Sequence, residues 1–199
     1  MTPRPDVSEE RKDQIVQAAI NVFARRGIHE TRMDDIVTET GLSKGTLYWY
    51  FKSKDDIIVA ISDMLFGREL QKLEQLDCED LPARDCLLKF LEVFIQDLRP
   101  MLKLRPVIFE FYALAFRNKS VRKIMQRYLE RFTGIIEPVV LRGMEVGEFA
   151  PGDARQATLA IGAALEGTLL LWAYAPKMVP AEEQLRASME LALKGLENT

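Results

Sequence analysis

The residues best suited to chemistry lie between Leu42 and Lys54, where lysines stand next to aromatic side chains. This segment contains three lysines and no acidic residue, so it carries a local positive charge. Ammonium groups neutralise nucleic-acid phosphates, while side chains in a groove contact the edges of bases. The segment therefore predicts a surface that binds DNA.

Two short helices joined by a tight turn must hold these side chains, over residues 32–51. Thr31 and Asp34 have the spacing of a capping box, which predicts the start of the first helix. Gly41 can adopt the left-handed conformation that ends a helix, and Ser43 can cap the second one. This order of elements is a helix-turn-helix, whose second helix enters the DNA major groove.

The orientation of the second helix follows from about 100° of rotation per residue. With Leu47 at the centre of the buried side, Phe51 and Tyr50 fall near it. The positions that point sideways or outward are Gly45, Thr46, Tyr48 and Trp49. The alternative, that the three consecutive aromatics fill a core, fits Tyr50 best and Tyr48 least.

The segment from Gln14 to about Leu65 resembles the DNA-binding domain of the tetracycline-repressor (TetR/AcrR) family. The likeness is carried by QIVQAAINVFARRG, by TRMDDI and by GLSKGTLYWYFKSKDDI. It implies that DNA is faced by Lys44, Thr46, Tyr48 and Trp49, and that Lys54 holds a phosphate. Ile28 replaces a usual aromatic residue, and Arg32 replaces a small hydroxyl residue. The candidate DNA-binding set is Arg32, Lys44 and Lys54 for phosphates, and Gly45, Thr46, Tyr48 and Trp49 for bases.

Global charge gives no support to DNA binding, because the 199 residues carry a net charge of −3. Residues 1–55 contain nine basic and nine acidic side chains, so this region is neutral as well. The attraction to DNA must come from the local lysine cluster. Because 48% of the residues are hydrophobic, the chain can bury a substantial core in one domain or two.

The sequence offers few candidates for catalytic residues. The sequence contains two cysteines, Cys78 and Cys86, and one histidine, His29. These residues cannot build a metal cluster, and they imply no disulfide framework. No nucleophile–base pair and no glycine-rich phosphate loop is apparent. We expect a protein without catalytic residues or a cofactor. The N-terminus shows no signal-peptide pattern, so we also expect a cytoplasmic protein.

Apolar residues recur at helical spacing along the whole chain and no segment alternates as a strand would. The sequence therefore predicts an all-α fold of about nine helices. We expect a DNA-binding domain over residues 8–54 and a linking helix over 55–76. We expect an effector-binding and dimerisation domain over 82–199, an overall plan that the family resemblance supplies.

A nearly continuous apolar helix is predicted over residues 153–175. A membrane span is the alternative, but its length is marginal and Glu166 near its middle would make insertion costly. A helix that is apolar all round is more simply buried on two sides. We therefore expect a four-helix dimer seam with the helix over 180–196. The residues assigned to this seam are Gly162, Ala163, Gly167, Leu185, Met189 and Leu193.

Aromatic residues on four predicted helices suggest an apolar pocket, although filling the core is the default for each one. They are Phe90, Phe94, Phe109, Tyr112, Phe116, Met125, Tyr128, Phe132 and Trp172, where Met125 adds an adaptable side chain. Glu110 and Glu166 lie in apolar runs, and a buried carboxylate needs a partner. An internal arginine such as Arg105 or Arg117 fits, and so does a cationic group on a hydrophobic ligand, with Glu166 in its site.

These features together predict a homodimeric, ligand-responsive regulator, a repressor that a small molecule releases from a palindromic operator. One alternative is an all-α enzyme or small-molecule carrier with an incidental helix-turn-helix. Another is an architectural DNA binder without a ligand, which leaves the aromatic half of the chain unexplained.

Overall fold

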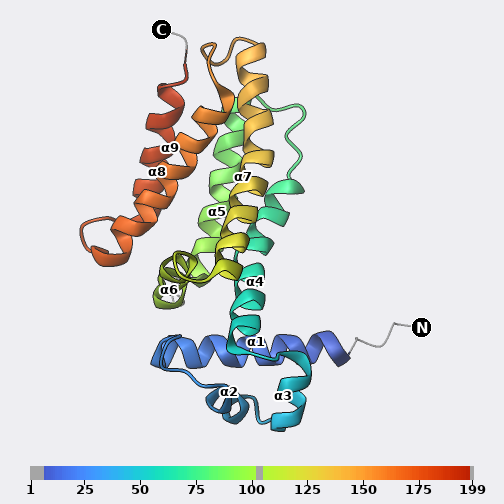
Figure 1. Cartoon of the computed structure of the whole chain (residues 1–199). Helices are drawn as coiled ribbons and strands as arrows, with labels where there is room; N and C mark the ends of the chain where they lie inside the picture. Colours follow the sequence, from blue (N-terminus) through green and yellow to red (C-terminus); the bar gives the residue numbers. More distant parts are fainter. Residues whose placement is uncertain (1–6, 102–104, 198–199) are drawn as a thin grey trace. The chain divides into compact units, whose positions relative to one another are not determined.

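The computed structural model describes residues 7–101 and 105–197, which contain nine α-helices (Figure 1). They are α1 (Val7–Arg26), α2 (Met33–Thr40), α3 (Lys44–Tyr50), α4 (Lys54–Glu74), α5 (Ala83–Met101), α6 (Arg105–Ala115), α7 (Lys119–Glu145), α8 (Ala154–Tyr174) and α9 (Ala181–Lys194). In this described part the extended pairing is a single bridge between Phe149 and Glu197. The predicted all-α fold is confirmed.

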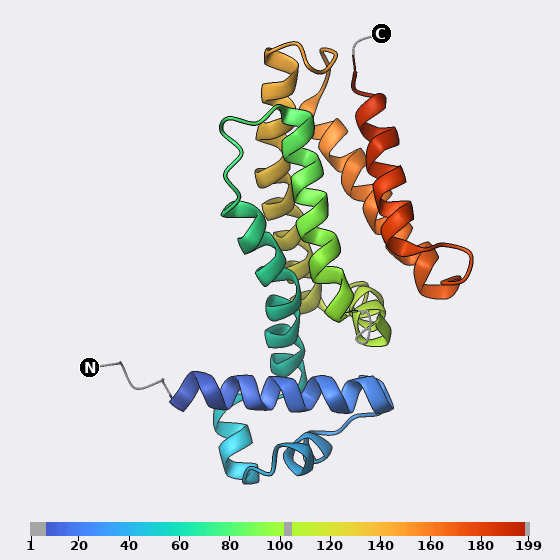
Figure 2. The ribbon, with the colours of Figure 1, turned by 180° about the vertical axis from the view of Figure 1, so that it is seen from behind.

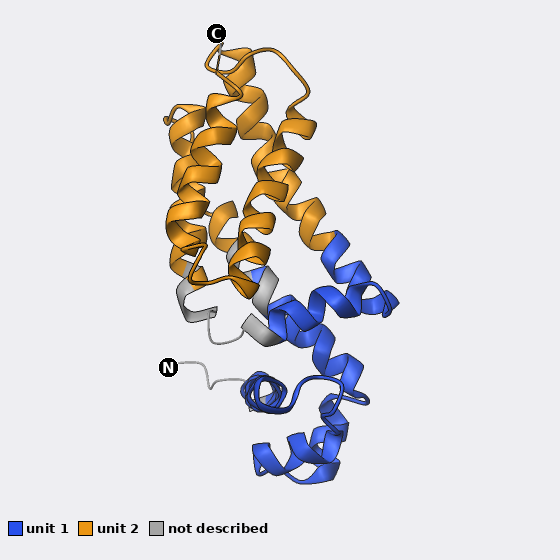
Figure 3. Cartoon of the chain, turned by 90° about the vertical axis from the view of Figure 1, so that its left-hand side faces the viewer, with its two compact units in different colours: residues 1–67, 100–126 blue, residues 68–99, 127–199 orange. Residues whose placement is uncertain are grey.

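The chain forms two compact units, which Figure 3 shows in different colours. Unit 1 contains residues 1–67 and 100–126, and unit 2 contains residues 68–99 and 127–199. The predicted boundary near residue 82 differs from this division. Helix α6 and the beginning of α7 belong to the same unit as α1, α2 and α3, and α4 and α7 each contribute to both units.

The core of unit 1 is built on α1, with α2 packed against α1 and α3 against α2 (Figure 2). A spacing of four residues places Ile15, Ala19 and Phe23 on one side of α1, where they are fully buried. Ile36 of α2 and Leu47 of α3 are also completely buried. One face of α3 is therefore fixed in the core, and its other face is turned outward.

Glycines with positive φ angles end α1 and α2: Gly27 has a φ of 81°, and Gly41, where a helix end was predicted, has a φ of 67°. The start of α2 differs from the prediction by one residue. The backbone N–H of Arg32 donates to the Asp35 carboxylate at 2.8 Å, which lowers the pKa of Asp35. The hydroxyl of Thr31 donates instead to the carbonyl oxygen of Gly27 at 2.7 Å. Thr31 thus ties down the end of α1 rather than the start of α2.

Unit 2 is a helical bundle in which α8 and α9 lie side by side (Figures 1 and 2). Its apolar core receives residues from α4, α5, α7, α8 and α9, including Leu87, Leu91, Val140 and Leu165. Gly143 permits close packing here, since a Cβ atom at this position would lie 2.4 Å from the Phe149 ring. The apolar stripes predicted from the sequence supply this core.

Helix α8 is apolar on both faces, although only one face is covered by the rest of the chain. Thr158, Ile161 and Leu165 lie on the buried face. Leu170 and Tyr174 lie on the other face and are exposed. Among the described residues, α8 is the one helix whose length and composition would suit a membrane span, with a mean hydropathy of 1.4. Only 17% of that stretch is buried, so a large apolar surface is left without a cover.

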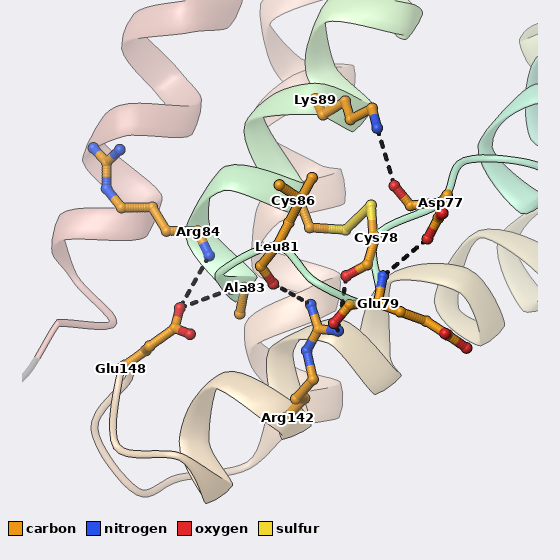
Figure 4. The surroundings of a disulfide bond; sticks show 10 residues. All are labelled: Asp77, Cys78, Glu79, Leu81, Ala83, Arg84, Cys86, Lys89, Arg142 and Glu148. Atoms are coloured by element: carbon orange, nitrogen blue, oxygen red, sulfur yellow. Dashed lines mark hydrogen bonds between the residues drawn. A yellow bond between two sulfur atoms is a disulfide. The ribbon is translucent and has the colours of Figure 1, made fainter.

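A disulfide joins Cys78 and Cys86 across the junction between the α4–α5 loop and α5, with 5.6 Å between their Cα atoms (Figure 4). No disulfide was expected from the sequence. The first turns of α5 bring Cys86 back beside the loop that carries Cys78. Arg142 of α7 holds the same loop, because its guanidinium donates to the carbonyl oxygens of Cys78, Glu79 and Leu81.

Candidate DNA-reading surface and effector region

The first turn of α3 is fixed by its own cap. The Ser43 hydroxyl oxygen accepts the backbone N–H of Thr46 at 3.1 Å, and the two hydroxyl groups lie 2.8 Å apart. Gly45 is exposed, and a Cβ atom there would meet only Ser43 Oγ at 3.8 Å. The cap fixes the first turn of α3, and no side chain covers the backbone at Gly45. DNA can therefore approach this backbone closely.

Two aromatic residues on the outer side of α3 are held by neighbours while they remain accessible. Trp49 is 67% exposed, and its ring meets that of Tyr50 edge to face, with 4.6 Å between centroids. The Tyr48 ring is half-buried and has the Lys44 ammonium group 5.9 Å from its centroid. The outward direction predicted for Trp49 is observed, and Tyr50 is half-buried beside it rather than enclosed in the core.

Three basic side chains near α3 are paired with acids of the same unit. Lys44 lies 2.7 Å from the Asp34 carboxylate, and this hydrogen bond raises the pKa of Lys44. Both side chains of that pair are exposed, so a DNA phosphate can take the place of Asp34. Two further ion pairs of 2.5 Å join the end of α1 to α2, namely Arg25 with Glu39 and Arg26 with Asp35. Arg32 is exposed and remains a candidate for a phosphate contact.

Lys54 does not have the surroundings expected of a phosphate ligand. Its ammonium group donates to the carbonyl oxygens of Ile28, His29 and Thr31 at 2.7, 3.1 and 2.8 Å. An ammonium group has three protons, and all three are used by the α1–α2 loop. In this structure Lys54, at the start of α4, holds the α1–α2 loop together, and the phosphate contact that the family resemblance implies stays a prediction.

The residues assigned to a dimer seam divide between the two faces of α8 and α9. Gly167 has open space around it, and Ala163 is exposed. Gly162 faces inward, because a Cβ atom there would lie 2.9 Å from the Phe132 ring. The three α9 residues, Leu185, Met189 and Leu193, are buried in the core of unit 2. Gly162 and these three are thus unavailable to a partner, since their stripe covers the protomer's own core.

The aromatic residues proposed for an effector pocket are shared between the two units. Phe90 is buried in the core of unit 2, and the partly buried side chains packed against that core include Phe94, Tyr128, Phe132 and Trp172. The members in unit 1 are Phe109, Tyr112, Phe116 and Met125. The rings of Phe109 and Tyr112 stack with 6.0 Å between centroids. Phe116 is 82% exposed at the end of α6, so its assignment to a pocket is wrong.

The two carboxylates that suggested a cationic ligand, those of Glu110 and Glu166, do not lie unpaired in an apolar pocket. Glu110 accepts the backbone N–H of Ile28 at 2.6 Å, a partner that the sequence did not reveal. Glu166 is exposed on α8 instead of facing a pocket, although nearby protein atoms desolvate its carboxylate enough to raise its pKa. Arg117 is exposed, and the Arg105 side chain lies outside the described ones. Neither Glu110 nor Glu166 therefore marks a site for a cationic group among the described side chains.

Comparison with known proteins covers both units. Residues 15–61 match the model of bacterial regulatory proteins of the tetR family, and residues 83–196 match that of the C-terminal part of BetI-type transcriptional repressors. The HTH-type transcriptional regulator YfiR of Bacillus subtilis (strain 168) is 31% identical over 152 residues, which are 74% of either chain. The fatty acid metabolism regulator protein of the same organism is 25% identical over 186 residues, covering 93% of this chain and 95% of its own.

Among solved structures, FadR from Bacillus subtilis in complex with stearoyl-CoA has the same fold, with a TM-score of 0.79. The likeness covers 93% of this chain and 99% of that one, at 24% identity. The resemblance first seen in the helix-turn-helix thus extends through the helices of unit 2. The chain belongs to the TetR family of bacterial transcription regulators.

Proposed function

We propose that this protein is a homodimeric repressor that binds a palindromic operator and leaves it when an apolar small molecule binds. The observation that carries the proposal is the geometry of α3. Leu47 anchors one side of this helix in the core, while Trp49 stands exposed on the other. The rigid helix presents Gly45, Thr46, Tyr48 and Trp49 to the major groove, as a recognition helix does. A regulator that acts on DNA works in the cytoplasm of a bacterium.

Trp49→Ala is expected to relax sequence discrimination rather than to weaken all DNA binding. One base pair in a site typically contributes about 1–3 kcal/mol of discrimination. A substitution in the operator under Trp49 should therefore lower wild-type affinity about 10- to 100-fold and the variant's affinity only a few-fold. The measurement is fluorescence anisotropy on an operator selected from random DNA and on its single-base variants.

Arg32→Ala is the matched control for this variant. Loss of a phosphate contact should weaken binding to all sequences alike and reduce the salt slope by about one unit. If Trp49→Ala instead keeps the wild-type ranking of operator variants, α3 does not read bases through this ring.

The exposed face of α8 supports assembly with a second copy of the chain. Residues three or four apart on a helix share a face, and this face contains Ala160, Ala163, Gly167, Leu170 and Tyr174. Small residues at its centre allow two helices to approach closely, while Leu170 and Tyr174 supply apolar contact area. A two-fold axis through this face would pair α8 with its own copy. The second copy would cover the apolar surface that the single protomer leaves exposed.

The effector site that we propose lies within unit 2, among α5, α7 and α8. Phe94, Phe132 and Trp172 come from these three helices, and each is partly buried against the same apolar core. Aromatic side chains between helices are typical linings of sites for apolar ligands. A solved relative carries stearoyl-CoA, whose acyl chain is such a ligand. We therefore place long-chain acyl compounds first among the candidates for the effector.

The decisive experiment for this function is a test of reciprocity. Coupling between two sites is a free energy of typically about 1–3 kcal/mol, and each ligand must change the affinity of the other by the same factor. Stearoyl-CoA and shorter acyl-CoAs should be titrated by calorimetry with and without saturating operator. We expect operator to weaken the tightest of these ligands about 5- to 150-fold. Equal affinity in both titrations would show that ligand binding does not control DNA binding.

A further inference from the structure

Residue Ile28, in the α1–α2 loop, is held from two sides by side chains of two other helices. Its backbone N–H donates to Glu110 Oε2 of α6 at 2.6 Å. Its carbonyl oxygen accepts from Lys54 Nζ of α4 at 2.7 Å. The Ile28 side chain is also buried, with 3% of its surface exposed. The backbone and the side chain of Ile28 are thus both fixed. The two residues that bond its backbone, Glu110 and Lys54, lie outside the helix-turn-helix.

Glu110 occupies a place that the end of α1 leaves vacant. The left-handed conformation of Gly27 turns the chain out of α1, so the N–H of Ile28 needs a partner beyond that helix. A Cβ atom on Gly27 would lie 3.2 Å from Glu110 Oε1, which shows how closely the carboxylate is seated. Glycine at this position therefore serves two purposes: it takes the positive φ angle and it leaves room for Glu110.

The hydrogen bond from Glu110 spans 82 residues of sequence but stays within unit 1. A second tie of the same kind joins the Asn118 side chain to the Asp55 carboxylate at 2.9 Å, near the start of α4. Helix α6 also packs against α1. The segment that contains α6 is therefore part of the body that carries the recognition helix, and Glu110 is its polar contact with the loop that leads into α2.

We infer that Glu110 is a positioning residue for operator reading, an inference that rests on the proposed function. Its carboxylate fixes the loop from Gly27 to Arg32, and this loop sets where α2 begins and how α2 and α3 stand on α1. The residue acts from α6 through a backbone N–H and needs no contact with DNA. Specific binding depends on the placement of α3, whereas non-specific binding depends mainly on charge.

The test uses the full-length protein and compares Glu110→Ala with Glu110→Gln. Removing a negative charge favours DNA binding by simple electrostatics, so any loss of affinity has the opposite sign from the charge effect. We expect Glu110→Ala to lower operator affinity about 10-fold, which is the scale of one lost hydrogen bond to a charged group. Affinity for random DNA should be unchanged or slightly higher. Glu110→Gln keeps an acceptor oxygen and should stay within about 3-fold of wild type.

Glu130→Ala is the matched control, because it removes an exposed carboxylate from α7 in unit 2. It should leave operator affinity at the wild-type value. Amide hydrogen exchange at Ile28 gives a readout that does not need DNA: exchange should be slow in wild type and in Glu110→Gln. In Glu110→Ala it should be at least about 10-fold faster, while the amide of Leu47 stays protected.

Operator binding by Glu110→Ala at or above the wild-type level would overturn the inference. An equal loss in Glu110→Gln and Glu110→Ala would overturn it as well, because the hydrogen bond would then not be what matters. If Glu110→Ala fails to fold, the exchange rate of Ile28 in Glu110→Gln decides, and fast exchange there rejects the contact. A wild-type protein that binds no selected operator would instead reject the proposed function itself.

Discussion

Lys54→Met is expected to lower the free energy of unfolding of unit 1 by about 3 kcal/mol. The ammonium group of Lys54 is the common donor for three loop carbonyl oxygens, and hydrogen bonds to a charged group contribute about 1.5–3 kcal/mol each without being additive. Affinity for all DNA should fall because α2 starts from this loop. The salt slope should not change, since no phosphate contact is lost. Urea unfolding and salt titration of operator binding measure the two effects.

Lys52→Met is the matched control for this substitution. Its ammonium group lies near the same surface and donates to the carbonyl of Tyr48 at 2.8 Å, at the exposed end of α3. Both variants remove one positive charge from the chain, so any effect of net charge on DNA binding is the same in the two. Only Lys54→Met should destabilise the fold strongly. A salt slope reduced by one unit in Lys54→Met, at full stability, would restore the phosphate role that the family resemblance implies.

Gly167→Arg is expected to convert the proposed dimer into monomers and to reduce operator affinity about 100-fold or more. Gly167 lies at the centre of the exposed apolar face of α8, where a Cβ atom would meet nothing within 4 Å in the protomer. The new side chain therefore leaves the protomer fold intact. In an isologous seam it places two added charged side chains in a largely apolar interface, where the desolvation of each charge costs about several kcal/mol. Sedimentation equilibrium at micromolar concentration measures the assembly.

Gly134→Arg provides the control, because Gly134 is an exposed helical glycine of unit 2 and, like Gly167, has nothing within 4 Å of an added Cβ atom. This variant should remain a dimer with wild-type operator affinity. Thermal unfolding should show that both variants fold. If Gly167→Arg still sediments as a dimer, the face of α8 is not the seam, and another surface must join the copies.

The helix-turn-helix could be predicted from sequence because its determinants are local. Ser43 caps α3, Gly41 ends α2 and Leu47 sets the buried side, all within a few residues of one another. The roles of Lys54 and Glu110 could not be predicted in this way. Their partners are backbone atoms 23 to 82 residues away, and no side-chain pattern marks a backbone N–H or carbonyl that lacks a partner.

The dimer seam could not be predicted from sequence for a different reason. Helix α8 is apolar on both faces, so periodicity cannot say which face covers the protomer and which one meets a partner. Gly162 and Gly167 look equivalent in sequence, yet one accommodates Phe132 and the other is open. Leu185, Met189 and Leu193 of α9 were assigned to the seam as an apolar face, but packing shows that this face covers the core of its own unit.

The internal pairing of charges near α3 lowers the non-specific affinity of the protein for DNA. Lys44, Arg25 and Arg26 each face a carboxylate of the same unit, and the first 55 residues carry no net charge. Non-specific affinity comes almost entirely from the release of counterions by free cations, so this surface holds ordinary DNA weakly. A bacterial chromosome offers about a million or more such competing sites. We therefore expect the wild-type protein to search by collision rather than by long sliding, so that fewer molecules are needed to keep one operator occupied.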